Sequence, residues 1–271
     1  MIEKKRLDQM LVELGLVQSR EQAKGMIMAG DVYVDHQKAD KPGMNVTAEM
    51  HFEVRGKKLA YVSRGGLKLE KALQVFPISL CGCAAMDIGA STGGFTDCML
   101  QNGAAKVYAI DVGYGQLAWK LRTDDRVVNL ERTNIRYITE EQVPHPVDFF
   151  SVDVSFISLT LVLPVAYRFL KDGGRAVCLI KPQFEVGKGR VGKKGVVREP
   201  ELHTEVIEKM TAFAVQTGFF VSGLDYSPVR GPEGNIEYLM FLEKLPIPGM
   251  IAADIPALVA RSHCELNGEQ S

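Results

Sequence analysis

Residues 87–97 read Asp-Ile-Gly-Ala-Ser-Thr-Gly-Gly-Phe-Thr-Asp. An apolar run, residues 83–86, precedes them, and Phe95, Cys98 and Met99 follow at helical spacing. The pattern predicts a buried strand, a glycine turn and a helix. Glycine lets the backbone turn tightly and approach a ligand closely, and a helix N-terminus offers unpaired N–H groups and a positive dipole end. We therefore expect a ligand to bind at this turn.

A second predicted strand, residues 107–111, ends in an acid about twenty residues after the glycine turn. Asp111 is thus placed to hydrogen-bond the two hydroxyls of a ribose. The dinucleotide fingerprint needs glycine at its first, third and sixth positions. Counted from Gly89, the third position is Ser91. A nicotinamide dehydrogenase is therefore disfavoured, whereas another cofactor that contains a nucleoside fits.

The spacing Asp87-x-Gly89-x-x-x-Gly93-Gly94 is similar to motif I of S-adenosylmethionine (SAM) methyltransferases. The resemblance implies that the loop binds the methionine end of SAM; the alternative is an ordinary strand-to-helix turn. Asn134 lies in the region that packs beside the adenine in such enzymes, where either base contact or the capping of a turn would explain it. The residues expected to bind SAM are Asp87, Gly89, Ala90, Ser91, Gly93, Gly94, Phe95, Asp111, Asn134 and Asp153.

The composition is that of a globular protein: 46% of the 271 residues are hydrophobic, 24% are charged, and the formal net charge is −1. Any signal for nucleic-acid binding must therefore be local. The five cysteines are an odd, scattered set without zinc-ligand spacing, so we expect a reduced cytoplasm and no bound metal. The N-terminus lacks the apolar core of a signal peptide, and no apolar run reaches the roughly 18 residues of a membrane span.

Residues 1–58 predict a small α+β domain. Residues 7–14 and 20–29 have apolar side chains at helical spacing, and residues 31–35 and 51–55 alternate like short strands. Within this region, Arg6-Leu7-Asp8, residues 19–23 and residues 27–34 together resemble the RNA-binding domain first seen in ribosomal protein S-four. The resemblance implies that a helix pair contacts structured RNA.

Basic side chains of this domain are candidates for contacts with RNA phosphates, which supply affinity and positioning rather than sequence readout. The alternative is a solvated charged face. The candidates are Lys4, Lys5, Arg6, Arg20 and Lys24.

The rest of the chain alternates between helices and strands, which predicts an α/β fold with a doubly wound, mostly parallel sheet. We expect seven strands in the Rossmann-like arrangement of SAM methyltransferases. In such sheets ligands bind beyond the carboxyl ends of the strands. Gly89, Asp111, Asp153 and Lys181 each follow a predicted strand. This architecture therefore brings residues that are distant in sequence to one rim.

Two further segments carry expectations about the fold. Residues 157–170 are almost entirely apolar and predict one buried helix. The tail, residues 246–271, contains proline and is weakly periodic, so we expect only a short helix at residues 257–261.

A glycine-rich basic loop spans residues 187–195. From Lys181 to Arg198 there are six basic residues and one acid, Glu185. A cationic loop beside the rim would suit a polyanion such as RNA; the alternative is a disordered surface loop. The further RNA-binding candidates are Arg64, Lys188, Arg190, Lys193 and Lys194.

Four segments, residues 63–68, 153–159, 181–185 and 235–238, resemble the Lys-Asp-Lys-Glu set of ribose 2′-O-methyltransferases. The matching residues are Lys68, Asp153, Lys181 and Glu237. With the N-terminal domain, residues 6–242 resemble the TlyA family of ribosomal RNA methyltransferases, also labelled hemolysin A, whose catalytic domain is FtsJ-like. Thr92 stands where FtsJ-type loops usually have proline.

The resemblance implies SAM-dependent cytidine 2′-O-methylation of ribosomal RNA, with ribosomal subunits as partners and no membrane. A ribose hydroxyl must lose its proton as it attacks, so positioning and proton removal dominate the chemistry. Lys181 is the candidate base. Lys68 would lower the pKa of Lys181 and stabilise the developing alkoxide, while Asp153 and Glu237 would orient both lysines. Structural ion pairing is the alternative for the two acids.

The expected domains are an RNA-binding domain (1–58), a linker (59–66), a methyltransferase domain (67–245) and a tail (246–271). Two other functions stay open at this point: a non-catalytic ribosome-binding or assembly factor, and a true hemolysin. The intact catalytic set disfavours the first, and the lack of a membrane-active segment disfavours the second. The oligomeric state is left open, with a monomer favoured.

Overall fold

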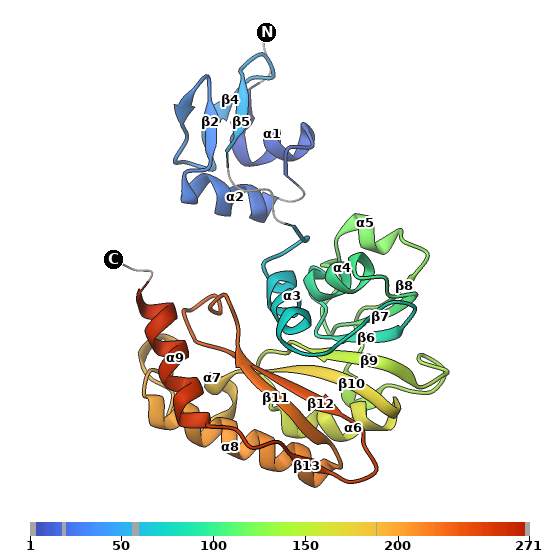
Figure 1. The fold of residues 1–271 in the computed structure, drawn as a ribbon. Helices are drawn as coiled ribbons and strands as arrows, with labels where there is room; N and C mark the ends of the chain where they lie inside the picture. Colours follow the sequence, from blue (N-terminus) through green and yellow to red (C-terminus); the bar gives the residue numbers. More distant parts are fainter. Residues whose placement is uncertain (1–3, 18–19, 56–59, 188, 269–271) are drawn as a thin grey trace. The chain divides into compact units, whose positions relative to one another are not determined.

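The structure, a computed structural model, describes residues 4–17, 20–55, 60–187 and 189–268. The chain forms two compact units, residues 1–59 and 60–271. Both are drawn in Figure 1, and each is described here by itself.

The small unit is an α+β domain with the predicted helix pair. Its elements are β1 (Lys5–Arg6), α1 (Leu7–Glu13), α2 (Arg20–Ala29), β2 (Val32–Val34), β3 (Gln37–Lys38), β4 (Asn45–Val46) and β5 (Phe52–Val54). The three strands β3-β2-β5 form an antiparallel sheet, and β1 pairs with β4. Leu7, Leu11, Ile27 and Val32 are fully buried in its core. The apolar stripes of the two helices thus account for the packing.

The large unit is built on one eight-stranded sheet with the order β13-β11-β12-β10-β9-β6-β7-β8. Its strands are β6 (Ala84–Ile88), β7 (Lys106–Ile110), β8 (Val127–Leu130), β9 (Val147–Val152), β10 (Leu170–Ile180), β11 (Phe220–Tyr226), β12 (Tyr238–Glu243) and β13 (Gly249–Met250). Pairing is parallel except on the two sides of β12. The doubly wound, mostly parallel sheet is confirmed; the prediction of seven strands missed β13.

Helices cover both faces of this sheet (Figure 1). They are α3 (Gly65–Val75), α4 (Gly94–Gln101), α5 (Trp119–Arg122), α6 (Leu163–Arg168), α7 (Pro182–Glu185), α8 (Pro200–Thr217) and α9 (Ile255–Gly268), with the 3-10 turns η1 (Ile135–Tyr137), η2 (Leu159–Leu161) and η3 (Lys193–Gly195). Successive strand residues enter opposite cores: Phe149 packs with α3 and α4, and Phe150 with α6 and α8. Such alternation is what a sheet buried on both faces requires.

Two expectations about the fold are wrong. Residues 157–170 do not form one helix, because the Ser158 side chain accepts the N–H of Thr160 and starts the 3-10 turn η2 before α6. The tail contains a 14-residue helix, α9, rather than a short one. Leu258 and Val259 of α9 are buried in the core that α8 covers. In the described ranges, no helix is both long and apolar enough to cross a lipid bilayer.

Candidate active site

The carboxyl ends of three parallel strands meet at one rim of the large sheet. β6 leads into Gly89, β9 into Asp153 and β10 into Lys181. Because β12 runs antiparallel to β10, the residue before it, Glu237, lies beside Lys181 at this rim. Lys68 reaches the same point from α3. The four residues predicted to be catalytic are therefore neighbours, although 169 residues separate Lys68 from Glu237.

Lys68, Asp153, Lys181 and Glu237 form an ion cluster, which we call the charged tetrad. Asp153 Oδ1 lies 2.6 Å from Lys181 Nζ, and Asp153 Oδ2 lies 3.4 Å from Lys68 Nζ. Lys68 Nζ also lies 2.5 Å from Glu237 Oε2. Lys181 Nζ donates a further hydrogen bond to Ser155 Oγ at 3.3 Å. Asp153 thus bridges both lysines, and Glu237 holds Lys68.

The tetrad is shielded from solvent, since Lys68, Lys181 and Glu237 expose only 8%, 7% and 1% of their surface. Burial acts to lower the pKa of Lys68, but the charges of Asp153 and Glu237 outweigh it and raise that pKa above its ordinary value. Burial acts to raise the pKa of Asp153, but Lys68 and Lys181 hold it below its ordinary value. Lys68 is therefore a fixed cation, and Asp153 is a fixed anion whose two oxygens contact the two lysines.

Two glycines shape the turn between β6 and α4. Gly89 and Gly93 have φ angles of 89° and 92°, in the left-handed region that favours glycine. A Cβ at Gly89 would lie 2.5 Å from the carbonyl oxygen of Asp153, so the turn packs against the strand end that carries the tetrad. At Gly93, a Cβ would lie 2.3 Å from Leu121, on the side of α5.

Asp87 supports this turn from behind. It is fully buried, and its Oδ2 accepts hydrogen bonds from Thr96 N–H at 2.9 Å and Thr96 Oγ1 at 2.7 Å. Its Oδ1 accepts from Ser151 Oγ at 3.2 Å. Burial raises the pKa of Asp87 to about 6. These bonds tie the end of β6 to the first turn of α4, so Asp87 fixes the shape of the loop.

A cavity of about 490 Å³ opens beside the turn. Asp111 lines it, and its two carboxylate oxygens accept the N–H groups of Ser91 and Gly113, both at 2.7 Å. Asn134 also lines the cavity while its side chain accepts the N–H of Arg136 at 3.1 Å, so it caps η1 and faces the cavity at once. Small-molecule sites span about 300–1,000 Å³. An acid at the second strand end and a turn that begins with Gly89 fit the ribose and methionine ends of SAM.

A second cavity, of about 330 Å³, is lined by all four tetrad residues and by Arg64. The two cavities share lining residues: Gly89, Ser91, Asp153 and Ser155. The other predicted cofactor residues that line the second cavity are Asp87, Ala90, Gly94 and Phe95. Ligands in the two cavities would therefore meet beside Asp153, as a group transfer requires.

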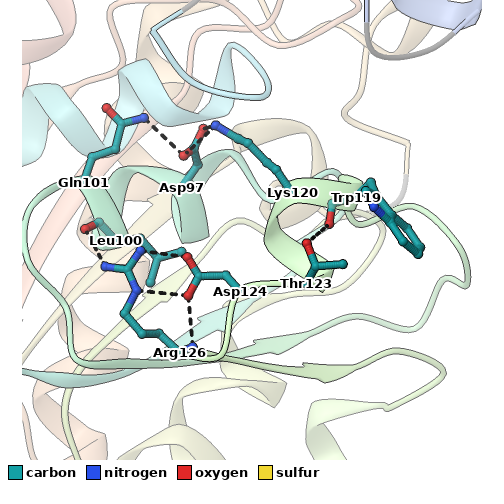
Figure 2. A network of polar contacts seen from close by, with 8 residues as sticks. All are labelled: Asp97, Leu100, Gln101, Trp119, Lys120, Thr123, Asp124 and Arg126. Carbon is teal, nitrogen blue, oxygen red and sulfur yellow. Dashed lines mark hydrogen bonds and ion pairs between the residues drawn. The ribbon is translucent and has the colours of Figure 1, made fainter.

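A polar network holds the helices next to the turn (Figure 2). Asp97 of α4 is 3% exposed, and its carboxylate accepts hydrogen bonds from Lys120 Nζ of α5 at 2.9 and 3.0 Å and from Gln101 at 3.1 Å. Just after α5, Arg126 donates two hydrogen bonds to the Asp124 carboxylate, at 3.0 and 2.7 Å. These contacts position α4 and α5 without involving the tetrad.

The basic residues predicted to bind RNA differ in their surroundings. In the small unit, Arg6 and Arg20 both bind the buried carboxylate of Asp8, at 2.9 and 3.1 Å. The hydrogen bond from Arg6 lowers the pKa of Asp8 to about 2, with Arg20 adding to the effect. Lys4 and Lys24 are exposed, and Lys5 lies 2.8 Å from Glu13.

In the large unit, Arg64 is exposed at the start of α3, and Lys194 is exposed within the glycine-rich basic loop. Arg190 lies 2.5 Å from Glu205 of α8. Lys188 and the Lys193 side chain lie outside the described residues.

Three residues at the site were not predicted from sequence. Ser155 accepts a hydrogen bond from Lys181. Phe156, with a φ of 64° and 92% of its surface exposed, lines the larger cavity. Asn235 is 1% exposed and hydrogen-bonded at both ends of its amide. Each lies within three residues of a tetrad member in the sequence, and this proximity was the only feature that could have indicated a role at the site.

Comparison with known proteins identifies the family of each of the two units. Residues 61–244 match the FtsJ-like methyltransferase family, and residues 5–52 match the S4 domain. The chain is 46% identical to 16S/23S rRNA (cytidine-2′-O)-methyltransferase TlyA of Mycobacterium tuberculosis (89% of this chain, 91% of the relative). It is 42% identical to Hemolysin A of Brachyspira hyodysenteriae (86% and 98%).

A solved structure, "Putative hemolysin from Streptococcus thermophilus", is 49% identical, with a TM-score of 0.81 over 100% of this chain and 99% of that one. The family matches and the geometry of the site thus both indicate SAM-dependent methyl transfer. The chain belongs to the TlyA family of FtsJ-like, SAM-dependent methyltransferases that carry an S4 domain.

Proposed function

We propose that this protein transfers a methyl group from SAM to the ribose 2′-hydroxyl of a cytidine in ribosomal RNA. The observation that carries the proposal is the charged tetrad in the second cavity, which meets the first cavity beside Asp153. The name of the Mycobacterium tuberculosis relative supports cytidine and both ribosomal subunits as the targets. An S4 domain supports an RNA substrate.

In the proposed reaction, bound SAM supplies an electrophilic methyl group on a positively charged sulfur. Lys181 in its neutral form accepts the proton of the 2′-hydroxyl at Nζ as the oxygen attacks. Asp153, 2.6 Å away, orients Nζ and stabilises the ammonium that forms. Lys68 keeps its charge throughout and stabilises the negative charge that develops on the hydroxyl oxygen. Glu237 holds Lys68 in place from the opposite side.

The remaining site residues would hold the cofactor. Asp111 would bind the ribose hydroxyls, and one of its two hydrogen bonds from backbone N–H groups would be replaced by a bond from the ligand. Asn134 would face the adenine. Gly89 and Gly94 would leave room for the methionine end, and Gly93 would support this part of the loop by letting it pack closely against α5. Asp87 would act through the loop that it braces, since its carboxylate is fully buried. The predicted contacts of Ala90, Ser91 and Phe95 also remain part of this proposal.

We assign RNA docking to residues 1–58, with residues 59–66 as a linker and catalysis in the segment from residue 67 onward. The tail joins the catalytic domain in this proposal because α9 packs on the same core as α8. Exposed Lys4, Lys24, Arg64 and Lys194 would contact phosphates directly. Arg6 and Arg20 would do so while paired with Asp8. A ribosomal RNA substrate supports a location in the cytoplasm, and we expect the protein to act there as a monomer.

The experiment that tests the proposal is methyl transfer from tritiated SAM to purified ribosomal subunits, followed by mass mapping of the labelled RNA. The expected product is a 2′-O-methylcytidine in ribosomal RNA. Label on a base, or on no RNA at all, would contradict the proposal; the second outcome would favour a ribosome-binding factor without catalysis. Red-cell lysis by the same preparation, measured in parallel, tests the hemolysin name of two relatives.

A further inference from the structure

Residues 227–235, between β11 and β12, lie beside the tetrad; we call them the capping loop. The base of the loop is closed, because Ser227 N–H donates to the carbonyl of Glu237, two residues beyond the loop, at 2.8 Å. Inside the loop, Gly231 N–H donates to the carbonyl of Asn235 at 2.9 Å, and Gly234 N–H donates to the carbonyl of Gly231 at 2.9 Å. Residues 229–232 line the second cavity. The loop is therefore a compact wall of the second cavity.

Gly231 of the capping loop packs against the carboxylate of Glu237. A Cβ at Gly231 would lie 2.8 Å from Glu237 Oε1, which is closer than real Cβ atoms approach. The other carboxylate oxygen, Oε2, lies 2.5 Å from Lys68 Nζ. Glu237 is thus held between the loop backbone and Lys68. A displacement of the loop would change the position of Glu237 and, through it, of Lys68.

Asn235 fixes the end of the capping loop from two sides. Its Oδ1 accepts the N–H of Val197 at 3.0 Å, and its Nδ2 donates to the carbonyl of Gly195 at 2.9 Å. The side chain is 1% exposed, so both bonds are shielded from competing water. Its partners flank the end of the glycine-rich basic loop, 38 and 40 residues away in sequence. An amide supplies both an acceptor and a donor at this reach.

We propose that Asn235 is a positioning residue that fixes Glu237 for methyl transfer by joining the capping loop to the glycine-rich loop. The inference rests on the proposed role of Glu237 in the tetrad. Asn235 lines neither of the two cavities, so we expect it to act through the loop and Glu237.

The test compares Asn235→Ala, Glu237→Gln and the double variant in methyl transfer to ribosomal subunits. We expect Asn235→Ala to lower kcat by about tenfold to a hundredfold, as small misplacements of catalytic groups do, with SAM affinity by calorimetry unchanged. The double variant should be no slower than Glu237→Gln, since residues that act through one group are not additive. Thr211→Val, which removes a buried hydroxyl bonded only within α8 at 2.9 Å, is the control for general destabilisation.

Wild-type kcat in Asn235→Ala beside an impaired Glu237→Gln would overturn this inference alone. Losses that multiply in the double variant would do the same, because they would indicate a separate structural effect. Full activity of Glu237→Gln would overturn both the tetrad role and the inference. If Asn235→Ala does not fold, Gly231→Ala presses on Glu237 without touching the amide. A lowered kcat in that variant supports loop control of Glu237, and an unchanged kcat refutes it.

Discussion

Gly89 offers a quantitative test of how the glycine turn supports the site, by replacement with alanine. Its φ of 89° would impose about 1–2 kcal/mol of strain on a residue with a Cβ. The new Cβ would also lie 2.5 Å from the carbonyl oxygen of Asp153, an overpacking that costs about 1–3 kcal/mol. The total loss of unfolding free energy is therefore about 2–5 kcal/mol, and relief of the clash would displace Asp153.

Gly82→Ala is the matched control, because Gly82 has a φ of 74° but no atom within 4 Å of the Cβ position. It should show only the strain, about 1–2 kcal/mol, with SAM binding intact. Thermal unfolding measures the first quantity, at roughly 2–4 °C for each kcal/mol in a unit of this size, and calorimetry with SAM measures the second. Equal melting temperatures for the two variants, with normal SAM binding by Gly89→Ala, would refute the packing argument.

Three further variants test other parts of the structure. Asp111→Ala should weaken SAM binding by about tenfold, because a half-buried, charged acceptor for the ribose is lost; unchanged affinity in calorimetry would remove Asp111 from the cofactor site. Burial lowers the pKa of His203 to about 4, so its contribution to stability is complete above the unfolded pKa and is lost as the pH falls. From pH 7 to pH 5 the wild-type large unit should lose about 2 kcal/mol that His203→Gln does not lose, as followed by chemical unfolding. Deletion of residues 1–59 should reduce RNA affinity about tenfold or more in filter binding while SAM affinity stays constant; equal RNA affinity would contradict the docking role.

The site could be predicted from sequence because parallel strands place their carboxyl ends at one edge. Gly89, Asp153 and Lys181 follow β6, β9 and β10 and needed only the strand assignment to be placed together. Glu237 precedes its strand and reaches the same rim because β12 is antiparallel. The pattern of apolar residues does not reveal the direction of a strand, so only the family resemblance could assign Glu237 to the catalytic site. Asp153 contacts both lysines, and this side-chain arrangement cannot be predicted from the spacing of residues in the sequence.

The errors in the fold prediction also have physical causes. Most of residues 157–170 are apolar, and this character masked Ser158 and Pro164, which mark the starts of the 3-10 turn η2 and of helix α6. The helix α9 was underestimated because its apolar face is short and its stability comes from packing on α8 and β11. The role of Asn235 could not be predicted from sequence, because it depends on two hydrogen bonds to residues about 40 positions away in the chain.

The central claim, that Lys181 removes the proton in methyl transfer, is tested most directly by Lys181→Met in the tritium assay on ribosomal subunits. Methionine preserves the length of the side chain, and Lys171→Met, at an exposed lysine 2.6 Å from Asp148, is the control. We predict that Lys181→Met binds SAM as the wild type does and loses 2′-O-methyl transfer by about 100-fold or more, whereas Lys171→Met remains active. Wild-type rates of 2′-O-methylation by Lys181→Met would contradict the account.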